Sequence, residues 1–306
     1  MTYTKFSVVV PLYNKKRNIC RCIRSVFAQT HAADELIVVD DGSTDGSADL
    51  LQKVFGHQVT LIRQPNGGVS RARNAGIHAA RNRYVALIDA DDEWHPTFLQ
   101  EITRLRSQFP DADLFGTAYE FRQGYKKSMP NLKKTSGETQ LIIEDYFDRI
   151  SQHDLLFNAS SVCIDRQFIV EHGGFPEGEP MGEDQDLWNR VALNGKIAYS
   201  AKSLAIYHLA ADNRVCLSDV PKKECPFSQR LETIARCAPP KLARQLRECS
   251  ASHILDLAKR NYLCGDIVAA KHLLRDKRTN LLARRKAYWW IRTILASIRF
   301  HASWSD

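Results

Sequence analysis

Carboxylates gather at two places in the first hundred residues, where they are suited to binding a metal-bound phosphate. Asp40 and Asp41 are adjacent, and Asp89, Asp91 and Asp92 follow later in the chain. Acids this close together repel one another unless a cation compensates. Because no His or Cys is interleaved with them, Mg²⁺ or Mn²⁺ suits them best. Such an ion binds through one or two carboxylates and the phosphates of a substrate.

Two arginines could complement the same phosphates. Arg71 and Arg73 follow the pair Gly67-Gly68 at an expected helix start, where backbone N–H groups also attract anions. Taken alone, each polar segment is better explained as a turn or a helix cap. The chain contains neither G-x-G-x-x-G after its first strand nor G-x-x-x-x-G-K-[ST], which disfavours a dinucleotide dehydrogenase and a P-loop nucleotidase. Together the segments predict a site for a nucleotide diphosphate held by metal.

The elements that must position these residues alternate between short β-branched runs and amphipathic stretches. Strands are expected at 6–10, 36–39, 59–62 and 84–88, and helices at 15–29, 47–55, 69–80 and after Pro96. This alternation predicts an α/β fold built from right-handed βαβ units, with a mostly parallel sheet flanked by helices. Ligands of such sheets bind beyond the carboxyl ends of the strands, where all the polar segments fall.

The second half of the chain is less regular and becomes helical. A strand is expected at 112–121, a loop at 123–137, and helices at 231–234, 251–263 and 267–274, followed by an amphipathic basic tail. The turn at 261–266 predicts a small helical hairpin. We therefore expect a catalytic domain over residues 1–213 and a basic helical region over 214–306.

The net charge of +8 is divided unevenly between these two regions. Residues 1–213 hold 24 basic and 27 acidic side chains, whereas residues 214–306 hold 19 and 8, a net of +11. This division disfavours nucleic acid as a partner. The eight cysteines include no C-x-x-C pair, which disfavours a zinc site. No signal peptide is recognisable, so we expect a cytoplasmic protein.

Four ordered segments resemble the motifs of family 2 glycosyltransferases with the GT-A fold. The matching segments are Val8–Asn14, Val38–Gly46, Asn66–Asn74 and Asp89-Ala90-Asp91. The resemblance covers roughly residues 5–210 and implies an inverting enzyme that uses a nucleotide-activated sugar. It also implies UDP as the expected carrier, with GDP and dTDP as alternatives.

The resemblance implies roles for most of the residues singled out above. The implied nucleotide-sugar ligands are Pro11, Tyr13, Asn14, Asp40, Asp41, Arg71, Arg73 and Asp89. Tyr13 would stack on the base. Asp91 would be the main ligand of a divalent Mn²⁺ or Mg²⁺ ion, with Asp89 directed toward the ribose or the metal. Asp92 is expected to be an outer residue or a helix cap.

The acceptor side of the family pattern is also present. Gly173-Gly174-Phe175 precedes Gly182-Glu183-Asp184, in which Asp184 matches the catalytic base and Glu183 its neighbour. His208 is a candidate metal or diphosphate ligand, or a structural histidine. Trp188 would line the acceptor pocket or anchor a helix. The Q-x-x-R-W order of processive synthases is absent, so we expect a non-processive enzyme.

The basic tail suggests where the acceptor is found. Residues 284–300 interleave five cations with aromatic and aliphatic side chains, as in helices that lie on an anionic membrane. We expect a saccharide or lipid-linked acceptor, as in lipopolysaccharide or surface polysaccharide synthesis, at the inner face of the plasma membrane. Alternatively, the helix packs on the hairpin or on a second subunit of a homo-oligomer. A catalytically silent GT-A scaffold that binds or assembles other proteins is the competing functional hypothesis.

Overall fold

The chain divides into two compact units. The computed structural model describes residues 4–130, 139–152, 154–210 and 220–302, with side chains to residue 296. The first unit comprises Met1–Glu144 and Leu155–Asn213, and the second comprises Asp145–Asp154 and Arg214–Asp306. Residues 145–154 thus group with the second unit, although they precede the expected boundary after residue 213.

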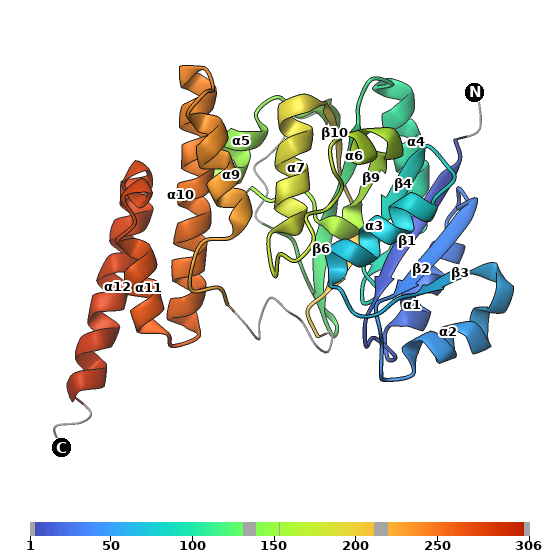
Figure 1. The fold of residues 1–306 in the computed structure, drawn as a ribbon, viewed down its shortest axis with the longest axis horizontal. Coiled ribbons are helices and arrows are strands. Elements are labelled where there is room, and N and C mark those ends of the chain that lie inside the picture. Colours follow the sequence, from blue (N-terminus) through green and yellow to red (C-terminus); the bar gives the residue numbers. More distant parts are fainter. Residues whose placement is uncertain (1–3, 131–138, 153, 211–219, 303–306) are drawn as a thin grey trace. The chain divides into compact units, whose positions relative to one another are not determined.

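The first unit alternates strands and helices along most of its length (Figure 1). Its strands are β1 (Phe6–Leu12), β2 (Glu35–Asp40), β3 (Thr60–Arg63), β4 (Tyr84–Leu87), β5 (Glu93–Trp94), β6 (Leu114–Gln123), β7 (Lys126–Ser128), β8 (Gln140–Ile142), β9 (Val162–Asp165) and β10 (Ile197–His208). Its helices are α1 (Ile19–Phe27), α2 (Ser47–Phe55), α3 (Val69–Ala79), α4 (Phe98–Gln108), α6 (Arg166–Glu171) and α7 (Glu183–Asn194), with 3-10 turns η1 (Gly56–Gln58) and η2 (Ala159–Ser161).

One mixed sheet runs through the first unit in the order β3-β2-β1-β4-β9-β6-β10-β5. The strands β3, β2, β1 and β4 are parallel, as are β6 and β10, which confirms the predicted α/β class. β9 was not predicted, and it lies antiparallel between β4 and β6. β7 pairs with β6 inside the stretch expected to be a loop, of which residues 131–137 lie outside the described part.

Helices cover both faces of the parallel strands. Alternate residues of β1, such as Phe6 and Val8, join a buried core with α1, α2 and α4. α3 packs on the opposite face, where Gly76 lies against Val9 of β1 and Val39 of β2. A Cβ at Gly76 would overlap Val9 Cγ1 and would lie 3.3 Å from Val39 Cγ2. The glycine therefore lets the helix backbone approach the sheet closely.

The second unit is helical. It contains α5 (Tyr146–Ser151), α9 (Pro226–Ala235), α10 (Pro240–Leu263), α11 (Ile267–Leu274), the 3-10 turn η3 (Lys277–Leu282) and α12 (Ala283–Ala302). The expected hairpin is formed by α10 and α11, but α10 is 24 residues long and begins at Pro240, well before the expected start at 251. Half-buried Trp289 and Trp290 of α12 pack against apolar residues of α10 and α11. Within the described residues, no helix has both the length and the apolarity needed to cross a membrane.

We predict that Gly76→Ala destabilises the first unit. Alanine favours a helix by about 1 kcal/mol over glycine, whereas overpacking costs about 1–3 kcal/mol. Because the new methyl group would meet β-branched side chains of a buried sheet, we expect the clash to prevail by about 1–2 kcal/mol. Denaturant unfolding measures this difference. His78→Ala, on the exposed side of the same helix, should stay within about 0.5 kcal/mol of the parent. Equal stability of Gly76→Ala and the parent would contradict the close approach.

Candidate active site

The loops that carry the predicted site residues meet at one edge of the sheet. The parallel register pairs Leu12 with Asp40, and β4 runs in the same direction beside β1. The chain therefore leaves β1, β2 and β4 at the same edge, and Tyr13, Asp41 and Asp89 follow directly. This is the edge at which ligands of parallel sheets bind.

The first acid pair holds the loops of this edge in place. Asp41 is 3% exposed, and its carboxylate accepts hydrogen bonds from Gln64 Nε2 at 2.7 Å, Gly67 N at 3.0 Å and Gly68 N at 2.8 Å. Asp40 is also buried and accepts a bond from the backbone N–H of Ser43 at 3.1 Å. The structure thus gives both acids a role in shaping the loops, beside the base-binding role predicted for them.

The residues at the end of β1 have two roles: Asn14 supports the neighbouring loop, and Tyr13 is exposed to solvent. Asn14 has φ +51°, and no other non-glycine residue in the described part of the chain has a positive φ. Its Oδ1 accepts bonds from Thr44 N at 2.8 Å and Asp45 N at 3.3 Å, which fixes the loop after β2. Pro11 is half-buried within β1. Tyr13 is 47% exposed, so its ring is accessible to a ligand.

The carboxylates of the D-x-D motif are each paired with a cation of the protein. Asp89 lies 2.8 Å from Arg73 and Asp91 lies 2.7 Å from Lys15. Asp92 is 1% exposed and accepts bonds from Ser160 Oγ and from the backbone N–H of His208. Burial, together with the negative charges of Asp91 and Asp89, raises the pKa of Asp92 well above its usual range. Asp92 is therefore a buried structural acid.

Arg73 connects the D-x-D motif to the acceptor segment. Its guanidinium donates to Asp89 at 2.8 Å and to Glu183 at 2.9 Å, and it lies 5.1 Å from the centre of the Phe175 ring. The side chain is buried; burial opposes its charge, but the carboxylates of Asp89 and Glu183 outweigh burial and raise the pKa. Its predicted contact with a diphosphate differs from this geometry, because the guanidinium is already shared between two carboxylates.

Arg71 is placed differently from Arg73. It is exposed and packs against Gly67, where an added Cβ would lie 3.0 Å from its Nη1. Among the described residues no ion pair involves Arg71. Arg71 is thus the arginine of this motif whose charge is accessible to an anionic ligand.

The acid pair Glu183-Asp184 forms the first turn of α7. Gly182, with φ +90°, precedes the helix and turns the chain into it. Asp184 Oδ1 accepts a bond from the backbone N–H of Gln185 at 2.7 Å. Burial and the neighbouring charge of Glu183 raise the pKa of Asp184 to about 7, against the opposing effect of Arg73. A carboxylate with this pKa is suited to accept a proton near neutral pH.

His208 lies at the end of β10, close to the D-x-D motif. Its Nε2 is 3.2 Å from Glu93 Oε2, because β10 pairs with β5 and Ile206 stands opposite Glu93. The structure therefore brings His208 next to this carboxylate, and its metal-binding role stays a prediction. The roles of Glu93 and Lys15 were missed, since neither belongs to a recognisable motif.

Trp188 is buried on α7 at 3% exposure. Its ring packs edge-on against Phe157 and Phe175, with centroid distances of 5.7 and 6.1 Å. This packing favours the helix-anchoring alternative over an acceptor-pocket wall. Phe175 in turn lies next to Arg73, so Trp188 supports Arg73 indirectly, through Phe175.

The donor atoms of this edge fit a divalent ion only in part. Within the described residues no three His, Cys, Asp or Glu side chains are grouped as a complete metal site. Asp89 and Asp91 together provide carboxylate oxygens of the kind that Mg²⁺ and Mn²⁺ take, and such ions complete their coordination with water and substrate phosphate. The residues present therefore fit an ion that arrives with a diphosphate.

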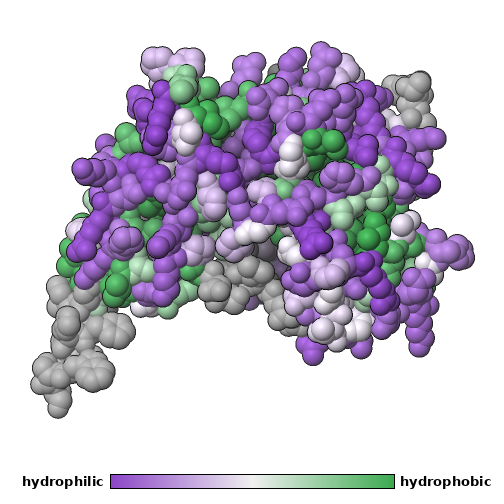
Figure 2. Space-filling model, in the orientation of Figure 1, coloured by the Kyte–Doolittle hydropathy of each residue, from purple (hydrophilic) through white to green (hydrophobic). Residues whose placement is uncertain are grey.

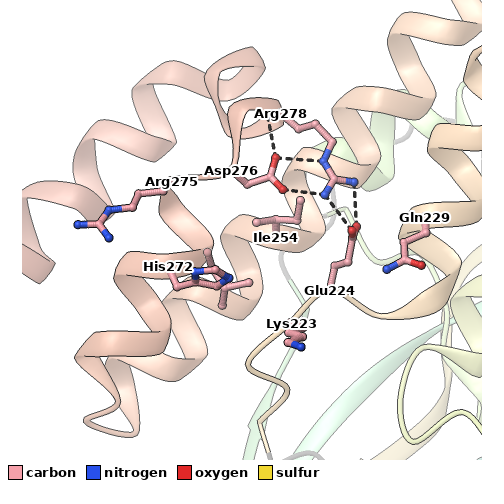
Figure 3. A pocket seen from close by; sticks show the side chains of 9 residues that line it. Lys223, Glu224, Gln229, Ile254, His272, Arg275, Asp276 and Arg278 are labelled. Carbon is pink, nitrogen blue, oxygen red and sulfur yellow. Dashed lines mark hydrogen bonds and ion pairs between the residues drawn. The ribbon is translucent and has the colours of Figure 1, made fainter.

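A pocket also lies within the helical unit, apart from the residues of the sheet edge (Figure 3). It has a volume of about 530 Å³ and is lined in part by Glu224, Asp276 and Arg278. Arg278 donates to both acids at 2.7–2.9 Å and neutralises them, as the dashed lines in Figure 3 show. Both acids of this pocket are thus already paired within the helical unit.

Comparison with known proteins indicates the family to which this chain belongs. The family described as Glycosyl transferase family 2 matches residues 7–173. The glycosyltransferase GlyG of Streptococcus pneumoniae is 34% identical over 215 residues, which cover 66% of this chain and 69% of GlyG. The uncharacterized glycosyltransferase YibD of Escherichia coli is 43% identical over 101 residues, which cover 32% of this chain and 29% of YibD. In three of the most similar relatives, the match covers only 29–36% of their own length.

A solved structure shares the fold. The crystal structure of S. aureus TarS in complex with UDP-GlcNAc has a TM-score of 0.71 and is 19% identical, covering 96% of this chain and 89% of that one. At this identity the likeness bears on the fold alone, and it agrees with the expected GT-A architecture. The family match extends over more than half of the chain and includes β1, β2, β4 and the loops between them. The chain therefore belongs to glycosyl transferase family 2.

Proposed function

We propose that this glycosyltransferase is inverting, metal-dependent and non-processive, and that it moves a sugar from a UDP-sugar to a saccharide or lipid-linked saccharide. One observation carries the proposal: Arg73 joins Asp89 of the donor motif to Glu183, the neighbour of Asp184. A donor bound at the D-x-D motif would thereby lie next to a carboxylate with a pKa of about 7. Those are the two components that an inverting transfer needs.

The choice of nucleotide rests on two points. The exposed ring of Tyr13 offers a stacking surface for a base at the edge where β1 ends. TarS, which shares the fold, has been crystallised with UDP-GlcNAc and with UDP. We infer a uridine nucleotide for this chain from that likeness and from the family.

In the proposed reaction, Asp184 accepts the proton of an acceptor hydroxyl. The hydroxyl oxygen forms a bond to the anomeric carbon from the face opposite the leaving group, and the bond from that carbon to the diphosphate breaks with its electron pair on the diphosphate. Exposed Arg71 stabilises the departing charge. Asp91 and Asp89 would hold a divalent ion, which when bound would offer further positive charge to the diphosphate.

We further propose that α12 attaches the enzyme to the inner face of the plasma membrane, where a lipid-linked acceptor for surface polysaccharide or lipopolysaccharide would be found. Residues 283–302 contain five arginines and lysines and no acid. Tyr288, Ile291 and Leu295 are 52–57% exposed and follow one another at helical spacing. Figure 2 shows hydrophobic surface among hydrophilic residues over the C-terminal helices. This combination of charge and apolar face is complementary to an anionic lipid surface.

The donor and the base can be tested together. We expect a thermal-shift screen of UDP-, GDP- and dTDP-sugars to show the largest stabilisation with a UDP-sugar and Mn²⁺. With that donor, Asp184→Asn should lower kcat about 10²–10⁴-fold while leaving donor binding intact. Glu171→Gln, which removes an exposed acid of α6, should retain full activity. Full turnover by Asp184→Asn would show that Asp184 is not the base, whereas absence of turnover by the parent with every donor would favour the silent-scaffold alternative.

The pKa of Asp184 predicts a pH profile. Because the base must be deprotonated, kcat/KM should rise with pH up to about 7 and then level off. Glu183→Gln removes a negative neighbour that raises this pKa, so the rising limb should move to lower pH. The profile is measured with saturating Mn²⁺ for both proteins. If the rising limb stays at the same pH in Glu183→Gln, the ionisation seen in the profile is not that of Asp184.

Membrane binding is measured by co-sedimentation with vesicles. We expect the full chain to sediment with phosphatidylglycerol vesicles far better than with phosphatidylcholine vesicles, and less as salt increases. Ile291→Ser combined with Leu295→Ser should weaken binding at least about tenfold, because two apolar side chains no longer enter the lipid. Leu263→Ser, at a 63% exposed position of α10, is the matched control. Equal loss in the double variant and this control would refute a specific role of α12.

A further inference from the structure

Lys15 connects the loop after β1 to the D-x-D motif. Its Nζ lies 2.7 Å from Asp91 Oδ2, and the two side chains are 14% and 18% exposed. The contact spans 76 positions of sequence. It exists because residues 15–18 form a turn ahead of α1, where Asn18 N and Ile19 N donate to the carbonyl of Lys15.

The ammonium of Lys15 contacts Asp91 Oδ2, one of the two oxygens through which Asp91 would bind a divalent ion. A carboxylate oxygen in contact with an ammonium group cannot at the same time bind a metal at full strength, because the two cations repel each other. Asp89 has a comparable cationic partner, but that partner is Arg73, which is 3% exposed and shared with Glu183. Lys15, by contrast, has a flexible stem and a single charge that can form new contacts.

Lys15 also borders open space. It lines a pocket of about 300 Å³ together with Lys16, Arg17 and Thr44, among others. Three basic side chains and one acid, Asp45, thus line a hollow that borders the Lys15–Asp91 pair through Lys15. A lysine that leaves Asp91 can turn toward this pocket, where phosphate oxygens would receive it.

We propose that Lys15 is an exchangeable counterion of the metal site. Lys15 neutralises Asp91 in the donor-free enzyme. When a divalent ion arrives with a nucleoside diphosphate, Lys15 leaves Asp91, and the carboxylate binds the ion. The proposal rests on the metal site of the proposed function. It implies that metal and diphosphate bind with strong positive cooperativity, because each alone must overcome the Lys15–Asp91 pair.

Binding of Mn²⁺, followed by electron paramagnetic resonance of the free ion, tests this proposal without turnover. We expect the parent to bind Mn²⁺ weakly alone and at least tenfold more tightly with UDP. Lys15→Met should bind Mn²⁺ alone at least tenfold more tightly than the parent and should lose most of the enhancement by UDP. Lys16→Met, which removes the same charge from the same pocket, should behave as the parent.

The outcomes separate this proposal from the metal site on which it rests. If the parent binds Mn²⁺ with UDP, and Lys15→Met does so with unchanged affinity and enhancement, Lys15 is not a competing counterion although the metal site stands. If Lys15→Met and Lys16→Met tighten Mn²⁺ binding equally, the effect is one of general charge and the proposal fails. If no protein binds Mn²⁺ even with UDP, or Asp91→Asn binds it as the parent does, the metal assignment itself fails.

Discussion

A buried guanidinium shared by two carboxylates holds the two halves of the candidate site together. Arg73 is 3% exposed and reaches Asp89 at 2.8 Å and Glu183 at 2.9 Å. Losing one partner of a buried ion network leaves a charge uncompensated, at a cost of about 3–5 kcal/mol. The loop after β4 and the first turn of α7 are therefore tied together through α3. Asn74, the next residue, adds hydrogen bonds to the backbone of Phe175 in both directions.

The acids after β4 show how one short segment organises a whole sheet edge. Asp89 pairs with α3, Asp91 with the loop after β1, Asp92 with η2 and β10, and Glu93 with His208. Repulsion among neighbouring carboxylates is relieved because their partners come from different directions. The same arrangement leaves Asp89 and Asp91 at the surface of the edge and Asp92 beneath it. A cluster that the sequence marks mainly as a ligand-binding segment is thus also a structural junction.

The sequence predicted what local pattern determines. Helix α2 has its expected bounds, and the strands of the parallel part lie within two residues of their predicted positions, because short β-branched apolar runs between amphipathic stretches mark them. β9 was not foreseen, since nothing in a four-residue segment with three apolar side chains specifies insertion between β4 and β6. At the site, motifs located Asp89, Asp91 and Asp184. They did not reveal that Arg73 faces carboxylates or that Lys15 reaches Asp91, because such contacts arise only when distant loops meet.

The close approach of α3 to the sheet has a consequence for how this chain can evolve. Gly76 lies directly over Val9 and near Val39, two neighbours in parallel strands. A side chain at position 76 first meets the methyl groups of these two valines. We therefore expect substitutions there to be concerted, with a larger residue at 76 accompanied by a smaller one at 9 or 39. The placement of α3, and with it that of Arg73, therefore depends on the volumes of two buried valines of the sheet.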